Sequence, residues 1–385
     1  MGNEYVITGG GPVGLWTAIQ IKKRMPDADI TIYERYQDYK RAHVLKLENI
    51  SMLLYAKPRR DAVEKAFFNE VFGSNLRKTF WQAVGGKSVF IRTNALEHAL
   101  KTYVEALDIP INYARINSPK ELISKHPNCQ HFIAADGAHS ALRQAIMGDD
   151  AVKNFPLQYV VEIKYEAQVQ TRPLSTTDQY KTNKLMSSMA FEYVGKEKNG
   201  QTPVSLRLFI DEATYNALPE ASFKAPLRLD DTRLPENLRN DIATYMGVRA
   251  AEAGEILLPQ SEKISKLTLS LYRAKKFAAS HENCNWYLVG DAAMGVPYFR
   301  SLNAGLLIGS QLGYILTQDN LSNNAKINAY NACRPLDVAW EFTAASMKNA
   351  ALCGYDQFRK ISSAVPWEFV KWDKKDQKTF KKFQP

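Results

Sequence analysis

The residues with the clearest chemical signal are three glycines near the N-terminus. Gly9, Gly11 and Gly14 form a Gly-x-Gly-x-x-Gly pattern in the run GGGPVG, and Glu34 follows 20 residues after the last of them. In such a pattern the first glycine permits a tight turn, the second lets backbone approach a pyrophosphate, and the third allows close packing of helix on strand. The later carboxylate is placed to accept hydrogen bonds from ribose hydroxyls. We therefore predict that this segment binds a dinucleotide.

The flanking residues predict the elements that position these groups. Residues 4–8 are typical of a strand, 15–21 carry apolar residues at helical spacing, and 30–33 form a second strand that ends in Glu34 and Arg35. The N-terminus of the intervening helix offers N–H groups and a partial positive charge to phosphates. A glycine turn alone is weak evidence, whereas strand, turn, helix, strand and acid in this order indicate a dinucleotide-binding unit.

Two acidic turns follow further predicted strands. Asp136 begins an Asp-Gly turn after the apolar run 131–135, and Asp291 belongs to a Gly-Asp turn with Gly290 after the run 286–289. Each aspartate alone could be a helix N-cap, a position that Asp favours. Their order after the glycine turn indicates instead that the three segments are not independent of one another.

These three segments resemble those of the single-component (class A) FAD-dependent monooxygenases. GGGPVG resembles the ADP-binding turn of that family, ADGAHSALR its Asp-Gly motif and LVGDAA its Gly-Asp motif. Tyr272-Arg273-Ala274 and the run 330–335 (YNACRP) are also similar to the family, so that the resemblance covers most of residues 4–335. Within the family, the run 41–47 (RAHVLKL) resembles the R-x-x-V-L-x-L stretch of the MICAL-type monooxygenases.

The resemblance implies FAD as cofactor and NAD(P)H as co-substrate. It assigns the FAD pyrophosphate to the glycine turn, with Arg41 and Arg92 as further phosphate ligands, the adenosine ribose to Glu34 and the ribityl chain to Asp291. The complete set of expected cofactor-binding residues is Gly9, Gly11, Pro12, Val13, Gly14, Glu34, Arg35, Arg41, Arg92, Asp136, Gly290, Asp291, Pro297 and Asn303. Only one glycine fingerprint is present, so we expect NAD(P)H to dock transiently.

The loop expected after Asp291 departs from the family pattern. Met294 stands where the family commonly has histidine, and the run 298–305 (YFRSLNAG) replaces a glycine-rich stretch. Pro297 is retained and is expected, with Asn303, near the isoalloxazine ring. The departures predict a differently shaped flavin pocket and leave the oxygenation step open.

No catalytic base follows from the sequence, which contains no Ser/His/Asp set and no clustered His/Cys ligands for a metal. The candidate catalytic residues are His43, in the MICAL-like stretch, and Tyr298 and Arg300, after the Gly-Asp turn. The alternative for Tyr298 is a core position, and a lone histidine is more often structural.

We predict an α/β fold, with a Rossmann-like FAD-binding domain of the glutathione-reductase and p-hydroxybenzoate-hydroxylase type, an inserted mixed or antiparallel β-sheet substrate domain, and a helical C-terminus. Alternation of period two in 159–167, 190–194, 204–210 and 266–272 predicts the inserted sheet, and 235–254 predicts a helix within it. The expected domains are 1–154 (FAD-binding, first part), 155–275 (substrate domain), 276–335 (FAD-binding, second part) and 336–385 (helical segment with basic tail).

The composition indicates a soluble cytoplasmic protein, with delivery into another cell left open. The 385 residues include only four scattered cysteines, typical of reduced thiols. No signal peptide is visible, and no apolar run approaches the roughly 20 residues of a membrane helix.

Part of the net charge of +10 lies in residues 371–385, where six lysines oppose two aspartates. This tail is either a solvated end or a tether for an acidic protein partner or an anionic surface. No nucleic-acid recognition motif accompanies it.

The leading functional hypothesis is an FAD-dependent monooxygenase that uses NAD(P)H and O2 to hydroxylate or oxidise an aromatic small molecule or a protein side chain. The alternatives are another flavoenzyme on the same scaffold, such as an oxidase or reductase, and a flavin-binding protein that acts mainly through partner binding.

Overall fold

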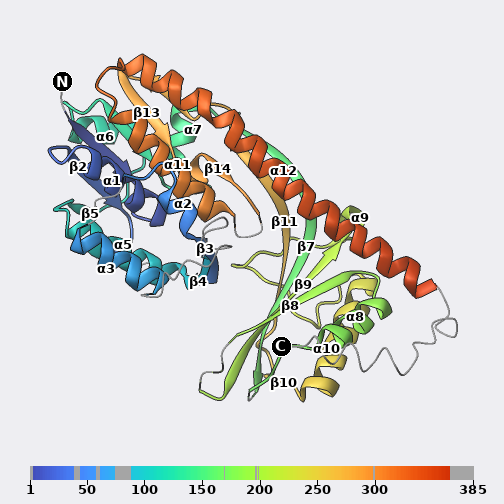
Figure 1. Ribbon diagram of the computed structural model, residues 1–385. Coiled ribbons are helices and arrows are strands. Elements are labelled where there is room, and N and C mark those ends of the chain that lie inside the picture. Colours follow the sequence, from blue (N-terminus) through green and yellow to red (C-terminus); the bar gives the residue numbers. More distant parts are fainter. Residues whose placement is uncertain are drawn as a thin grey trace, which may run out of the picture. The chain divides into compact units, whose positions relative to one another are not determined.

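The computed structural model describes residues 3–38, 44–57, 61–73, 88–168, 170–195, 197, 199–297 and 300–364. The chain divides into two compact units. Unit 1 comprises residues 1–156 and 270–346, and unit 2 comprises 157–269 and the chain from 347 onward. Strands β7 (Val152–Gln168) and β11 (Lys263–Ala274) and helix α12 (Asn323–Ala364) have residues in both units (Figure 1).

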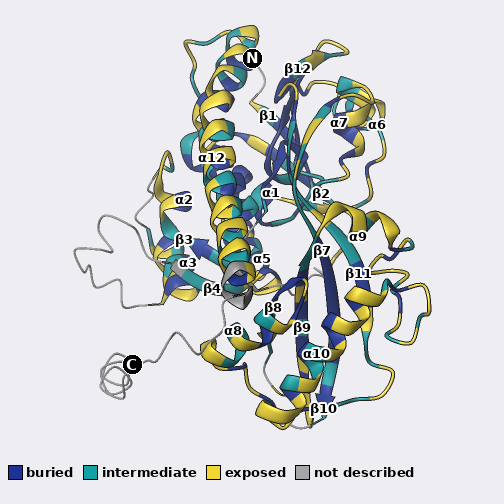
Figure 2. Cartoon of the chain, turned by 90° about the vertical axis from the view of Figure 1, so that its right-hand side faces the viewer, coloured by how far each residue is buried: buried dark blue, intermediate teal, exposed yellow. Residues whose placement is uncertain are grey.

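Unit 1 contains a six-stranded sheet of the Rossmann-like kind. Its strand order is β12 (Ala278–His281), β13 (Cys284–Leu288), β6 (His131–Ala134), β1 (Glu4–Thr8), β2 (Asp29–Glu34) and β5 (Ile111–Tyr113). All neighbours are parallel except β12, which is antiparallel to β13. The inner strands are almost wholly buried (Figure 2), which explains their nearly continuous apolar sequences. The carboxyl ends of the parallel strands therefore meet at one edge.

Helix α1 (Pro12–Arg24) packs beside α11 (Ser301–Leu316) (Figure 1). Trp16 is fully buried, and its Nε1 donates to Ser310 Oγ at 2.8 Å. The remaining elements of unit 1 are α2 (Asn49–Leu53), α3 (Ala62–Phe72), α5 (Thr93–Glu105), α6 (Pro119–Lys125), α7 (Ala141–Met147), the 3-10 turn η1 (Gly290–Ala292), β14 (Met294–Gly295), and the antiparallel pair of β3 (Val44–Glu48) and β4 (Ser88–Arg92).

Unit 2 contains an antiparallel sheet. Strand β7 pairs with β9 (Gln201–Ile210), β9 pairs with β8 (Met189–Val194), and β10 (Ile256–Leu257) pairs with β7. Apolar residues face each other across the central pair, as in Val161 opposite Leu208. Besides the last part of α12, the described helices of this unit are α8 (Thr176–Leu185), α9 (Glu212–Ala217) and α10 (Glu236–Ala253).

A buried ion-pair cluster lies in the core of unit 2. Arg249 of α10 is fully buried, and its Nε donates to both carboxylate oxygens of Glu255 at 3.1 and 3.0 Å. The guanidinium also pairs with Glu192 of β8. Because all three side chains are removed from water, each charge depends on the others for its stability.

The predicted fold class is confirmed: a parallel Rossmann-like sheet accompanies an antiparallel sheet. The helix expected at 235–254 is α10. The loop that was expected to reach Asn303 ends earlier, because α11 begins at Ser301 and places Asn303 in its first turn. Within the described ranges, no helix is long and apolar enough to cross a membrane.

Candidate cofactor-binding site

A cavity of about 400 Å³ lies at the carboxyl edge of the parallel sheet in unit 1. It brings together the three segments that the sequence singled out: the glycine turn after β1, the Asp-Gly turn after β6 and the Gly-Asp turn after β13. The predicted residues that line it are Gly9, Gly11, Pro12, Val13, Gly14, Glu34, Arg35, Asp136, Gly290 and Asp291.

The three fingerprint glycines differ in their surroundings. Gly9 has φ +108°, and a Cβ there would lie 2.2 Å from the carbonyl oxygen of Ala135. A Cβ on Gly14 would lie 2.0 Å from the carbonyl oxygen of Gly9, whereas one on Gly11 would meet no protein atom within 4 Å. Gly9 and Gly14 thus permit the turn and its close packing, and Gly11 leaves open space beside the cavity.

The N-terminus of α1 also lies at this cavity. Gly11 is its N-cap, no side chain caps the helix and its first turn carries no acidic residue. No acidic residue of the helix's own first turn therefore offsets the partial positive charge at its N-terminus. Together with the open space at Gly11, this arrangement suits an anionic group such as a pyrophosphate.

Glu34 is fixed at the end of β2 by backbone donors. Its Oε2 accepts from the N–H of Gly10 at 2.7 Å, and its Oε1 accepts from the N–H of Tyr36 at 2.9 Å. Each carboxylate oxygen can accept further hydrogen bonds, so the group can still receive ribose hydroxyls. Two exposed arginines also line the cavity: Arg35, which follows Glu34, and Arg115, which follows β5. Sequence analysis did not identify Arg115, because the short strand β5 gave no recognisable pattern.

The Gly-Asp turn is held by residues from two other segments. The Tyr272 hydroxyl donates to the carbonyl oxygen of Asp291 at 2.9 Å, and Arg143 Nη1 donates to that of Ala292 at 2.8 Å. The Ser301 hydroxyl donates to the Asp291 carboxylate. Arg143 is buried and belongs to the ADGAHSALR segment, so part of that motif supports the turn.

Asp136 and Thr8 leave unused polar capacity at the cavity. Burial raises the pKa of the Asp136 carboxyl above its usual value. Among the described residues, Asp136 Oδ1 and the Thr8 hydroxyl have no hydrogen-bond partner. Buried polar atoms without partners are uncommon in proteins, and both residues line the cavity. Together with the Gly11 opening, the α1 terminus and Glu34, they fit a ligand with phosphate and hydroxyl groups.

Three of the predicted cofactor-binding residues that the structure describes do not line the cavity. Arg92 is the exposed N-cap of α5, and the next residue, Thr93, lines the cavity instead. Asn303 accepts from the backbone N–H of Glu48 at 2.9 Å and donates to the carbonyl oxygen of Lys46 at 2.8 Å. Half-buried Pro297 follows β14, and Arg41 lies outside the described residues.

Of the catalytic candidates, His43 and Tyr298 also lie outside the described residues. Arg300 forms a two-pronged ion pair with Glu341 of α12, with Nε at 2.6 Å and Nη2 at 3.0 Å from the carboxylate oxygens. These hydrogen bonds raise the pKa of Arg300. Its guanidinium therefore anchors α12 in unit 1 and does not line the cavity.

Solved structures of low sequence identity share this fold. No protein-family model and no curated protein matches the sequence. The Diels-Alderase PyrE3 of pyrroindomycin biosynthesis matches at 13% identity over 94% of this chain and 77% of its own, with a TM-score of 0.58. The tetrameric form of 2-methyl-3-hydroxypyridine-5-carboxylic acid oxygenase matches at 14% identity over 94% and 95%, with a TM-score of 0.55.

CtdE, solved in complex with FAD and a substrate, matches at 14% identity over 89% of this chain and 88% of its own, with a TM-score of 0.54. Likeness at this level of identity establishes fold and leaves activity open. The MICAL-like interpretation of residues 41–47 receives no support from these comparisons. The chain has the fold of the p-hydroxybenzoate-hydroxylase-type FAD monooxygenases.

Proposed function

We propose that this protein is an FAD-dependent monooxygenase that uses NAD(P)H and O2 to hydroxylate or oxidise an aromatic small molecule or a protein side chain. The observation that carries the proposal is the convergence of the glycine turn, Glu34 and the Gly-Asp turn on one cavity at the carboxyl edge of a Rossmann-like sheet. When bound, FAD would supply hydride acceptance and the activation of oxygen.

Different described residues would bind different parts of the cofactor. Gly11 and the N-terminus of α1 would bind the pyrophosphate, because the backbone is open there and the helix end is uncapped. Glu34 would accept the ribose hydroxyls, with Arg35 and Arg115 beside it. Asp291 would bind the ribityl hydroxyls, with the Ser301 hydroxyl holding one of its oxygens.

The remaining sequence predictions enter as parts of the same proposal. Arg41 and Arg92 stay candidates for the phosphates, and Pro297 and Asn303 for the surroundings of the isoalloxazine. The division into an FAD-binding domain and a substrate domain at 155–275 stays a prediction. Four further points also stay predictions: a cytoplasmic location, transient NAD(P)H docking, a role for the basic tail and the absence of nucleic-acid binding.

The deciding experiment is the visible absorption spectrum of the purified full chain with FAD, followed by NADH or NADPH under air. We expect bound flavin bands that bleach with a nicotinamide and recover with oxygen. A protein that neither retains nor takes up FAD refutes the proposed cofactor. Bound flavin that never bleaches refutes the monooxygenase proposal alone.

A second candidate is a flavin-binding protein whose activity does not require NAD(P)H. Two observations favour it: the departures after Asp291, and the presence of a Diels-Alderase among the proteins that share the fold. Tight FAD binding with no reaction toward either nicotinamide is the result that this candidate predicts.

A further inference from the structure

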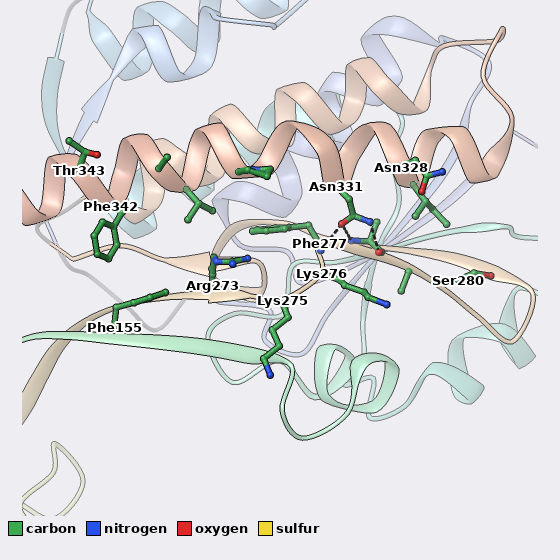
Figure 3. Close-up of a pocket in the computed structure, with 16 residues that line it drawn as sticks. Phe155, Arg273, Lys275, Lys276, Phe277, Ser280, Asn328, Asn331, Phe342 and Thr343 are labelled. Atoms are coloured by element: carbon green, nitrogen blue, oxygen red, sulfur yellow. Dashed lines mark hydrogen bonds between the residues drawn. The ribbon is translucent and has the colours of Figure 1, made fainter.

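A second, larger cavity of about 890 Å³ lies elsewhere in unit 1 (Figure 3). Its walls come from three places: the start of β7, the turn that joins β11 to β12, and the first half of α12. It shares no lining residue with the cofactor cavity. A ligand in the second cavity would therefore not occupy the proposed FAD site.

The walls of this cavity are fixed by hydrogen bonds. The side chain of Asn331 on α12 accepts from the N–H groups of Phe277 and Ala278 at 2.9 and 3.0 Å, and donates to the carbonyl oxygen of Ala278 at 2.9 Å (Figure 3). These bonds join the helix to the turn after β11. The cavity is thus formed by ordered elements, as ligand sites usually are.

Aromatic rings supply much of the apolar lining. Phe155 of β7 and Phe342 of α12 meet edge to face, with ring centroids 5.4 Å apart, and Phe277, in the turn between β11 and β12, is a buried lining residue. Phe342 is 38% exposed, which is high for such a large apolar side chain. A bound molecule with an apolar body would cover this surface.

The charged residues that line the cavity are all cations: Arg273, Lys275 and Lys276, from one short stretch of chain. Lys275 forms an ion pair with the exposed Asp150, which is not a lining residue. Arg273 is only half exposed, and its one hydrogen bond to a described residue goes to the carbonyl oxygen of Ala274 at 3.3 Å. Among the described residues, neither Arg273 nor Lys276 forms an ion pair.

We infer that this cavity binds a small organic anion. The acid group would meet the Arg273 guanidinium, whose planar set of donors matches a carboxylate or sulfonate and loses little solvation on doing so. The apolar body would lie against Phe155 and Phe342. Three cationic side chains and no acidic side chain line the cavity, which favours an anionic ligand. The aromatic walls favour an organic anion over an inorganic ion.

The test is a fluorescence titration of the full chain, saturated with FAD, with 8-anilinonaphthalene-1-sulfonate. We expect saturable binding, and weaker binding by about tenfold or more in Arg273→Gln, because a charge-assisted hydrogen bond is lost. The matched control is Lys120→Gln, which removes one exposed charge from α6 in the same unit and is expected to change the affinity less than twofold. N-phenyl-1-naphthylamine, which lacks the sulfonate, should not distinguish Arg273→Gln from the wild type.

A second variant guards against misfolding of the first. Ala339 is an exposed lining residue on α12, so Ala339→Trp should obstruct the cavity without burying a new side chain in the core. It is expected to abolish probe binding. Decanoate should displace the probe, and inorganic phosphate should not.

Equal affinities of Arg273→Gln and Lys120→Gln would overturn the inference, as would undiminished binding to Ala339→Trp. Displacement by phosphate alone would show an inorganic anion site and overturn the organic part. Repeating the titration without FAD separates this result from the proposed cofactor, because binding here does not require flavin.

Discussion

Gly11→Ala separates a role in ligand binding from a role in folding. At Gly11 the backbone has φ −72° and ψ 173°, which alanine adopts without strain, and the new Cβ would meet no protein atom within 4 Å. Alanine is a poorer N-cap than glycine, whereas Gly→Ala reduces the entropy of the unfolded chain. The two effects oppose each other, so we expect the free energy of unfolding without FAD to change by less than about 1 kcal/mol.

The same methyl group should obstruct the cofactor. It would enter the space where the proposed pyrophosphate approaches the backbone, and forcing one extra methyl group into a packed contact costs about 1–3 kcal/mol. That energy corresponds to an increase in the Kd for FAD of about five- to 150-fold. Flavin fluorescence quenching measures the Kd, and thermal unfolding of the FAD-free protein measures the stability.

Two other glycines provide controls for this experiment. Gly247→Ala, on the exposed face of α10, also places a Cβ where no protein atom lies within 4 Å, and should leave FAD affinity unchanged. Gly14→Ala would place its Cβ 2.0 Å from the carbonyl oxygen of Gly9 and should damage folding and binding together. A Gly11→Ala protein with the wild-type Kd for FAD would refute the assignment of the pyrophosphate to this turn.

Three further predictions follow from single side chains. Glu34→Gln should raise the Kd for FAD about tenfold, because it weakens a charge-assisted hydrogen bond. Flavin titration measures this Kd, and an unchanged value would contradict the assignment of the ribose to Glu34. Burial lowers the pKa of the His131 imidazole to about 4, so the folded protein holds this ring neutral at a pH where the unfolded chain protonates it. The free energy of unfolding is therefore unaffected above pH 6.5 and falls by about 3 kcal/mol as the pH drops toward 4. Urea unfolding should show this loss in the wild type and not in His131→Phe. Arg249→Ala should lower the free energy of unfolding by about 3–5 kcal/mol, because it leaves Glu192 and Glu255 buried without their cation. Arg233→Ala breaks an exposed pair with Asp231 and should lower the free energy of unfolding far less. Equal losses in these two variants would refute the burial argument.

The parts of the fold that follow from sequence are those with strong local patterns. The run 4–8, the glycine turn and the helix after it appear as β1, its turn and α1, because buried parallel strands and helix starts impose specific residue types. Alternation of period two likewise located β7 and β9, which lie in an antiparallel sheet.

The features that sequence analysis missed depend on contacts between distant segments. Arg115 reaches the cavity only because the three-residue strand β5 pairs with β2, and three residues carry no usable periodicity. Arg300 was a catalytic candidate because of its position after the Gly-Asp turn. Its pairing with Glu341 arises from the folding of α12, 41 residues along the chain, which no local pattern reports.

The structure gives a physical reason why the three motifs occur as a set. A Cβ at Gly9 would collide with Ala135, which precedes the Asp-Gly turn, so the glycine turn depends on the position of β6. Arg143, from the Asp-Gly segment, holds the carbonyl oxygen of Ala292 in the Gly-Asp turn. Gly290 in turn has φ +59°, and a Cβ there would lie 3.2 Å from Val13 at the start of α1. Each motif thus positions the next, so a mutation that breaks one of these packing contacts should disturb the proposed cofactor site through all three.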